Sequence, residues 1–117
     1  MKQEEFEKLV VEAVEALPKF FKDKLDNVDL VVEAWPAPEF ARGRLLLGLY
    51  QGVPLTSRGR GYNLAVPDKI SIFQGPIMWV SHGDPQAIKN VVTDTVKHEI
   101  AHHFGISDER LQELERK

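Results

Sequence analysis

The longest periodic segment of the chain is DPQAIKNVVTDTVKHEIAHHFG, residues 84–105. Asp84 is an N-cap residue, and Pro85 suits the first helical position, where an N–H would have no partner. Gly105 can adopt the left-handed conformation that ends many helices. The sequence therefore predicts a helix of about five turns that begins at Pro85 and stops at Gly105. The apolar residues that recur with helical spacing are Ile88, Val91, Val92, Val96, Ile100 and Phe104.

Three elements are expected near the amino terminus. Apolar and charged residues alternate with helical spacing from Glu4 to Leu17, and Pro18 stops this amphipathic helix. Residues 19–25 add one or two further turns. The Val and Leu content of residues 28–35 favours a strand, which Pro36 ends.

The rest of the chain predicts a long connection, a strand and a short terminal helix. Residues 39–67 have no regular period outside the apolar run at residues 45–50, so a long connection is expected there. Residues 69–73 alternate with period two, which predicts a strand ended by Gly75-Pro76. Ser107 is an N-cap residue for the terminal helix.

Length and composition exclude several classes of protein. The 117 residues suffice for one modest core, so a single domain over residues 1–117 is expected. Cysteine is absent, so any metal must bind His, Asp or Glu side chains. The net charge of −3 argues against general nucleic-acid binding. No apolar run approaches the roughly 20 residues of a membrane-spanning helix. Acidic residues at the start, Glu4 and Glu5, do not suit a secretion signal, so a cytoplasmic location is expected.

The chemistry of the chain is concentrated in the pattern His98-Glu99-Ile100-Ala101-His102. Residues four apart lie on one face of a helix, so the imidazoles of His98 and His102 can reach one metal ion. Glu99 lies one position along and leans toward the open side of that ion. This spacing is typical of metal-dependent hydrolysis, in which Glu99 would be the general base.

The motif extends to His98-Glu-x-x-His102-x-x-Gly105-x-x-Asp108. Gly105 can turn the chain back so that Asp108 approaches the same metal as a third ligand. With this extension the sequence resembles the zincin metallopeptidases. The spacing is similar to that of the metzincin branch, in which the third ligand is usually His and sometimes Asp.

The resemblance covers nearly the whole chain. The segment from Leu47 to Leu55, the strand entry at Pro67-Asp68-Lys69-Ile70 and the closing segment from His102 to Leu111 resemble the small bacterial zincin-like metallopeptidase family. This resemblance implies an α+β fold in which the active-site helix packs on a small sheet. It also implies a peptide or protein substrate. We expect zinc to be bound by His98, His102 and Asp108, with Glu99 as the catalytic base.

Other assignments of the third ligand stay open. Glu109 or Glu113 could replace Asp108. An arrangement in which the third ligand is a Glu from a separate downstream helix would need Glu113 or Glu115, which follow the motif too closely. Asp108 could also be an ordinary acidic residue in the first turn of the terminal helix, where the helix dipole favours it.

Five further side chains are candidates for smaller roles. His103 points about 100° away from His102 around the helix and should face the core or solvent. His82 precedes the long helix and could contact substrate. Asp94 lies four residues before His98 and could orient its imidazole. Tyr50 and Tyr62 could each donate a hydrogen bond to a developing oxyanion.

Two features of the sequence support alternative functions. Methionine occurs only at Met1 and Met78, before the motif, so the methionine turn of a full metzincin is not expected, and a non-catalytic metal-binding domain is the alternative function. The segment from Glu39 to Asp68 carries four arginines and no acid between its ends, which suits binding of carboxylate, phosphate or nucleic acid. For a peptide substrate, the strand Ile70–Phe73 is the expected edge of the cleft.

Overall fold

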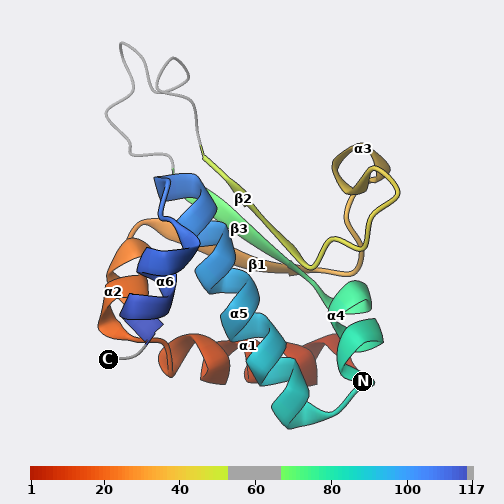
Figure 1. The fold of residues 1–117 in the computed structure, drawn as a ribbon. Helices are drawn as coiled ribbons and strands as arrows, with labels where there is room; N and C mark the ends of the chain where they lie inside the picture. Colours follow the sequence, from red (N-terminus) through yellow and green to blue (C-terminus); the bar gives the residue numbers. More distant parts are fainter. Residues whose placement is uncertain (53–66, 116–117) are drawn as a thin grey trace.

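The computed structural model of the chain describes residues 1–52 and 67–115. Figure 1 shows the arrangement of the helices and strands in these residues. Their order and bounds are α1 (Gln3–Glu15), α2 (Lys19–Lys24), β1 (Val28–Glu33), α3 (Pro38–Ala41), β2 (Gly48–Gln51), β3 (Asp68–Phe73), α4 (Gln74–Ser81), α5 (Pro85–Phe104) and α6 (Asp108–Glu115).

The sheet has the strand order β1-β3-β2 over the described residues. Strand β1 runs parallel to β3, and strand β2 runs antiparallel to β3. The expectation that Ile70–Phe73 forms the cleft edge is wrong, because these residues belong to the central strand β3. Each residue from Ile70 to Phe73 is buried, which is typical of a strand with a neighbour on either side. The edge nearest α5 is β2.

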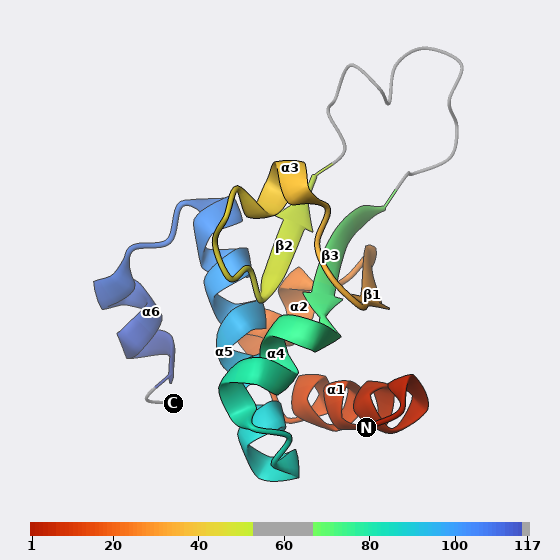
Figure 2. The ribbon, with the colours of Figure 1, turned by 90° about the vertical axis from the view of Figure 1, so that its right-hand side faces the viewer.

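The core lies between the sheet and the two long helices, α1 and α5. Ile70 and Ile72 of β3 face this core together with Phe6 of α1 and Ile88 of α5, and all four are fully buried. Figure 2 shows α5 between the sheet and α6. The expected α+β fold, with the motif helix packed on a small sheet, is confirmed.

The ends of α5 and the start of α6 agree with the caps predicted from the sequence. The Asp84 carboxylate accepts a hydrogen bond from the Ala87 N–H at 2.8 Å, and Gly105 ends the helix with φ 68°. The Ser107 hydroxyl accepts a hydrogen bond from the Arg110 N–H at 3.1 Å, as expected of an N-cap. Within the described residues, no helix has the length and apolar character needed to cross a membrane.

Three local features differ from what the sequence predicts. Residues 39–67 are not only a connection, because α3 overlaps their start and β2 lies within them. β3 ends at Phe73, before Gly75-Pro76, as expected, but these two residues lie in the first turn of the unpredicted helix α4, where proline removes no needed hydrogen bond. A Cβ atom at position 75 would overlap the ring of Trp35. The first strand ends at Glu33, two residues before the expected end.

Candidate metal centre

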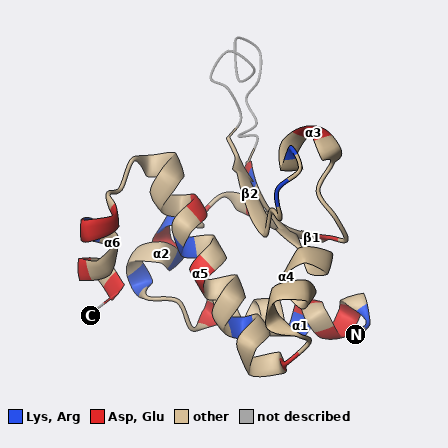
Figure 3. Cartoon of the chain, turned by 45° about the vertical axis from the view of Figure 1, so that its right-hand side comes forward, with Lys and Arg blue, Asp and Glu red and all other residues tan. Residues whose placement is uncertain are grey.

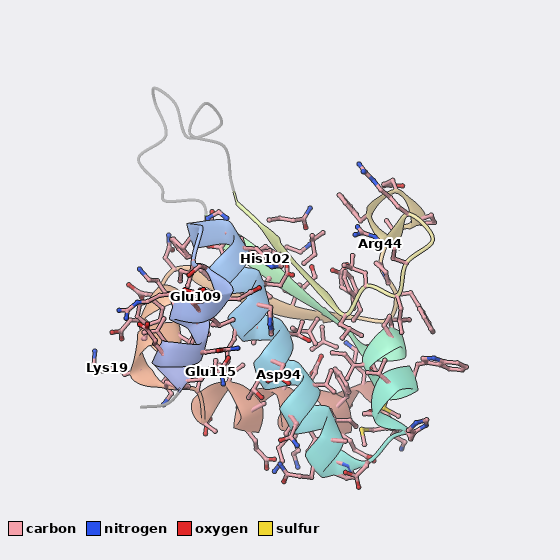
Figure 4. All side chains as sticks on the ribbon, viewed as in Figure 1. Lys19, Arg44, Asp94, His102, Glu109 and Glu115 are labelled. Carbon is pink, nitrogen blue, oxygen red and sulfur yellow. The ribbon has the colours of Figure 1, made fainter. Side chains whose placement is uncertain are left out.

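The two motif histidines lie on one exposed face of α5. His98 and His102 are both exposed, and their ring centroids are 6.4 Å apart. In Figure 4, His102 lies near one end of α5, and Asp94 lies further along the same helix. The helical spacing therefore places both imidazoles at the surface, where an ion can reach them.

The His98 ring has the orientation of a metal ligand. Its Nδ1 lies 2.7 Å from the backbone carbonyl oxygen of Asp94. A carbonyl only accepts hydrogen bonds, so Nδ1 is the donor here, and in the neutral imidazole Nε2 then has the lone pair that a metal ligand needs. Metal-binding histidines commonly use their second nitrogen in this way. The contact uses the backbone carbonyl of Asp94, and the Asp94 side chain is exposed, so the structure assigns its carboxylate no part in orienting the imidazole.

Asp108 and His98 line the same groove between α5 and α6. Asp108 is the first residue of α6, which Gly105 and the two residues after it connect to α5. The groove has a volume of about 420 Å³. Its lining residues are Asp94, His98, Asp108, Leu111, Gln112 and Glu115. Acidic residues dominate α6, as Figure 3 shows, so the groove is suited to a cation.

The ligand set stays a prediction. Within residues 1–52 and 67–115, no three His, Asp or Glu side chains are close enough to hold one metal ion. The donor types nevertheless fit zinc, which binds imidazole nitrogen and carboxylate oxygen. Among the alternatives to Asp108, Glu109 is exposed and Glu113 accepts a hydrogen bond from Arg110 at 3.0 Å.

Glu99 contacts the edge strand β2. Its Oε1 accepts a hydrogen bond from the Tyr50 N–H at 2.8 Å. The Phe73 N–H donates a hydrogen bond to the Leu47 carbonyl, so these two residues form a hydrogen-bonded pair between β2 and β3. Along an antiparallel ladder, such pairs alternate with pairs that are not hydrogen-bonded to each other. The backbone groups of Gly48 and Tyr50 therefore turn away from β3 toward the open edge. Glu99, the expected catalytic base, therefore lies at this edge and accepts a hydrogen bond from the backbone of β2 there.

A glycine allows β2 to approach α5 closely. A Cβ atom at Gly48 would lie 2.6 Å from Cγ2 of Thr95 and 3.0 Å from the carbonyl oxygen of Ser71. Thr95 lies one helical turn before Glu99 on α5. The absence of a side chain at Gly48 therefore lets the carboxylate of Glu99 reach the Tyr50 N–H.

Gly48→Ala should lower the free energy of unfolding by about 1–3 kcal/mol, because the added methyl group overpacks the contact with Thr95. Urea denaturation measures this change. The matched control is the double variant Gly48→Ala/Thr95→Ser, which removes the opposing methyl group and should recover part of the lost stability. A single variant as stable as the wild type would contradict the close approach of β2 and α5.

Tyr50 and His103 connect the end of β2 to α5. The two rings are stacked with centroids 3.9 Å apart. The Tyr50 hydroxyl donates to Asp68 Oδ2 at 2.7 Å, and Asp68 Oδ2 lies 3.9 Å from Nε2 of His103. The structure therefore gives the Tyr50 hydroxyl a partner other than an oxyanion, and it packs the His103 ring against Tyr50 of β2, on a different side of α5 from the motif pair.

The other sequence candidates do not gather at this centre. His82 is an exposed residue with φ 54° that caps α4. Arg42 and Arg44 are exposed beside α3, where Figure 3 shows basic colouring. The remaining candidates of this group, Tyr62, Arg58 and Arg60, lie outside the described residues.

A second cleft lies on the other side of His98, and the sequence analysis did not anticipate it. It has a volume of about 350 Å³ and separates the segment leading into β2 from α4 and α5. The only sequence signal for it was the apolar run at residues 45–50. Its lining residues are Leu46, Leu47, Gly48, Val80, Val91, Asp94, Thr95, His98 and Glu99.

A family model described as zincin-like metallopeptidase matches residues 25–117, which include β1, β2, β3 and the motif helix α5. No match was found among curated proteins.

Proposed function

Because the chain belongs to the zincin-like metallopeptidase family, we propose that it is a zinc-dependent hydrolase of peptide bonds. The observation that carries this proposal is the geometry of α5. It orients the exposed His98 ring through a contact of Nδ1, exposes His102 on the same face and directs Glu99 to the edge of the sheet.

Each residue of the centre has a distinct role in this proposal. His98, His102 and Asp108 hold the zinc ion. When bound, zinc supplies the Lewis acidity that polarises a substrate carbonyl. The Glu99 carboxylate takes the proton of the attacking water and passes it to the leaving amine. The extended peptide lies beside β2, which replaces β3 as the edge of the cleft.

The protein should bind one zinc ion per chain. At a free zinc concentration of 100 times the dissociation constant, binding raises the free energy of unfolding by about 2.7 kcal/mol. Elemental analysis and thermal unfolding with added zinc measure both effects. His98→Ala should abolish them, whereas His82→Ala, which changes an exposed histidine away from the motif, should keep them. Absence of zinc and of stabilisation in the wild type would refute the proposal.

The second candidate function is a non-catalytic metal-binding domain. The specific observation in its favour is the hydrogen bond between Glu99 and the Tyr50 N–H, which gives this glutamate a structural role without catalysis. Full zinc loading without cleavage of any peptide would favour it. The cytoplasmic location and the peptide or protein substrate expected from the sequence also stay predictions.

A further inference from the structure

Tyr50 of β2 contacts two successive turns of α5. Glu99 and His103 are four residues apart, so they lie on one face of this helix. The Tyr50 N–H donates a hydrogen bond to Glu99 Oε1 at 2.8 Å. The Tyr50 ring stacks on the His103 ring, with centroids 3.9 Å apart and an angle of 19° between the ring planes. The same residue of the edge strand is therefore held by α5 at its backbone and at its side chain.

Asp68, the first residue of β3, holds the far end of the Tyr50 side chain. Its Oδ2 atom accepts a hydrogen bond from the Tyr50 hydroxyl at 2.7 Å and lies 3.9 Å from Nε2 of His103. The Asp68 side chain is only 20% exposed, so this hydrogen bond is stronger than it would be in water. The Tyr50 ring is thus fixed on its face by α5 and at its hydroxyl by the central strand.

The backbone that follows β2 leaves room for the His103 ring. A Cβ atom at Gly52 would lie 3.0 Å from Cε1 of His103, closer than an ordinary van der Waals contact. The absence of a side chain at Gly52 therefore lets the imidazole lie flat against Tyr50. Three separate segments, the end of β2, the start of β3 and the last turn of α5, meet around the Tyr50 ring.

The orientation of Glu99 depends on where the Tyr50 N–H lies. Strand β2 has four residues and lies at the edge of the sheet, so in the described residues only one neighbouring strand holds it. A carboxylate has two oxygens, and a hydrogen bond that fixes Oε1 of Glu99 leaves Oε2 to accept the proton of an attacking water. A shift of the Tyr50 backbone would turn this carboxylate. Displacement of a reacting group by about 1 Å can cost about a hundredfold in rate.

We propose that His103 and Asp68 are positioning residues for the catalytic base. Together they hold the Tyr50 ring, the ring fixes the backbone of β2, and the Tyr50 N–H fixes the Glu99 carboxylate. Neither residue is one of the proposed zinc ligands, and both act through Tyr50. This inference rests on the proposed function, because that function gives Glu99 its role as the base.

Hydrogen exchange of the Tyr50 amide tests the positioning without any cleavage. It is measured by nuclear magnetic resonance on the full chain with added zinc. In His103→Ala the Tyr50 amide should exchange about threefold to tenfold faster, the factor that corresponds to the net loss of one hydrogen bond. In His103→Phe, which restores a stacked ring, the rate should return to that of the wild type. The amides of β3 serve as the reference, because general destabilisation would accelerate their exchange as well.

Steady-state kinetics on a cleaved library peptide test the effect on the base. His103→Ala should lower kcat by about tenfold or more with KM and zinc content unchanged, because only the orientation of the carboxylate is lost. His103→Phe should recover most of kcat. The matched control is Val10→Ala, which leaves a cavity at a buried position of α1 and lowers stability. This control should leave kcat unchanged.

Tyr50→Phe separates the contribution of Asp68 from that of His103. It removes the hydroxyl group and keeps the stacked ring. Exchange of the amide at position 50 should therefore accelerate, and kcat should fall, in both cases by less than in His103→Ala. An exchange rate and a kcat equal to those of the wild type would mean that Asp68 has no part in the positioning.

The outcomes separate this inference from the proposed function. Zinc-loaded wild-type protein that cuts no peptide would refute hydrolysis, and faster exchange at Tyr50 in His103→Ala would then still support the fixing of Glu99 by His103. Unchanged exchange in His103→Ala, or faster exchange with unchanged kcat in an active enzyme, would overturn the inference. Equal effects of His103→Ala and His103→Phe would also overturn it, because the stacked ring would then not be what holds Tyr50.

Discussion

Zinc-dependent cleavage of a peptide library should fall at least about a hundredfold in Glu99→Gln, because the amide cannot accept the proton of the attacking water. The Gln side-chain oxygen can still accept the hydrogen bond from the Tyr50 N–H, so β2 should keep its place beside α5. Zinc content should stay at one ion per chain. Mass spectrometry of the digested library and elemental analysis measure the two quantities.

Glu99→Ala is the comparison that separates the two roles of this residue. It removes both the base and the partner of Tyr50, so it should also lower the free energy of unfolding by about 0.5–1.5 kcal/mol, the usual contribution of one hydrogen bond. Cleavage that persists in Glu99→Gln would mean that a contaminating protease or another residue performs the reaction. Fully metallated wild-type protein that cuts no peptide would favour the non-catalytic alternative.

Asp108→Ala should weaken zinc binding by about a hundredfold or more. Loss of a residue that merely orients a ligand typically costs 10–100-fold in affinity, and loss of a direct ligand should cost at least as much. The fold should survive, because Asp108 is exposed at the start of α6, whereas Leu111 anchors that helix in the core. Competition with a chromogenic zinc chelator measures the affinity.

Glu109→Ala is the matched control for this variant. Glu109 is the next residue of α6, is exposed and carries the same charge, so its loss changes the local electrostatics without removing the proposed ligand. Equal zinc affinities of Asp108→Ala and the wild type would mean that another residue is the third ligand. A large loss of zinc affinity in Glu109→Ala would identify Glu109 as that ligand. Glu113 is the next alternative.

Four of the described helices, α1, α2, α5 and α6, could be predicted from the sequence because their signals are local, whereas α3 and α4 were not predicted. The bounds of α5 follow from Asp84, Pro85 and Gly105, whose effects on the backbone act within one helical turn. The relative placement of His98, Glu99 and His102 follows from the same helix. The fold class also followed from the sequence, through the family resemblance that the family match confirms.

The tertiary structure decided which backbone and which apolar surface lie beside the motif. Strand β2 was not predicted, because the run at residues 45–50 has no period-two alternation, and its pairing with β3 joins residues far apart in the chain. The same pairing made β2 the edge instead of Ile70–Phe73. The Glu99 contact with Tyr50, the close approach at Gly48 and the cleft near Val80 all depend on this pairing. Contacts between distant segments form only when the core packs, so no local pattern in the sequence specifies them.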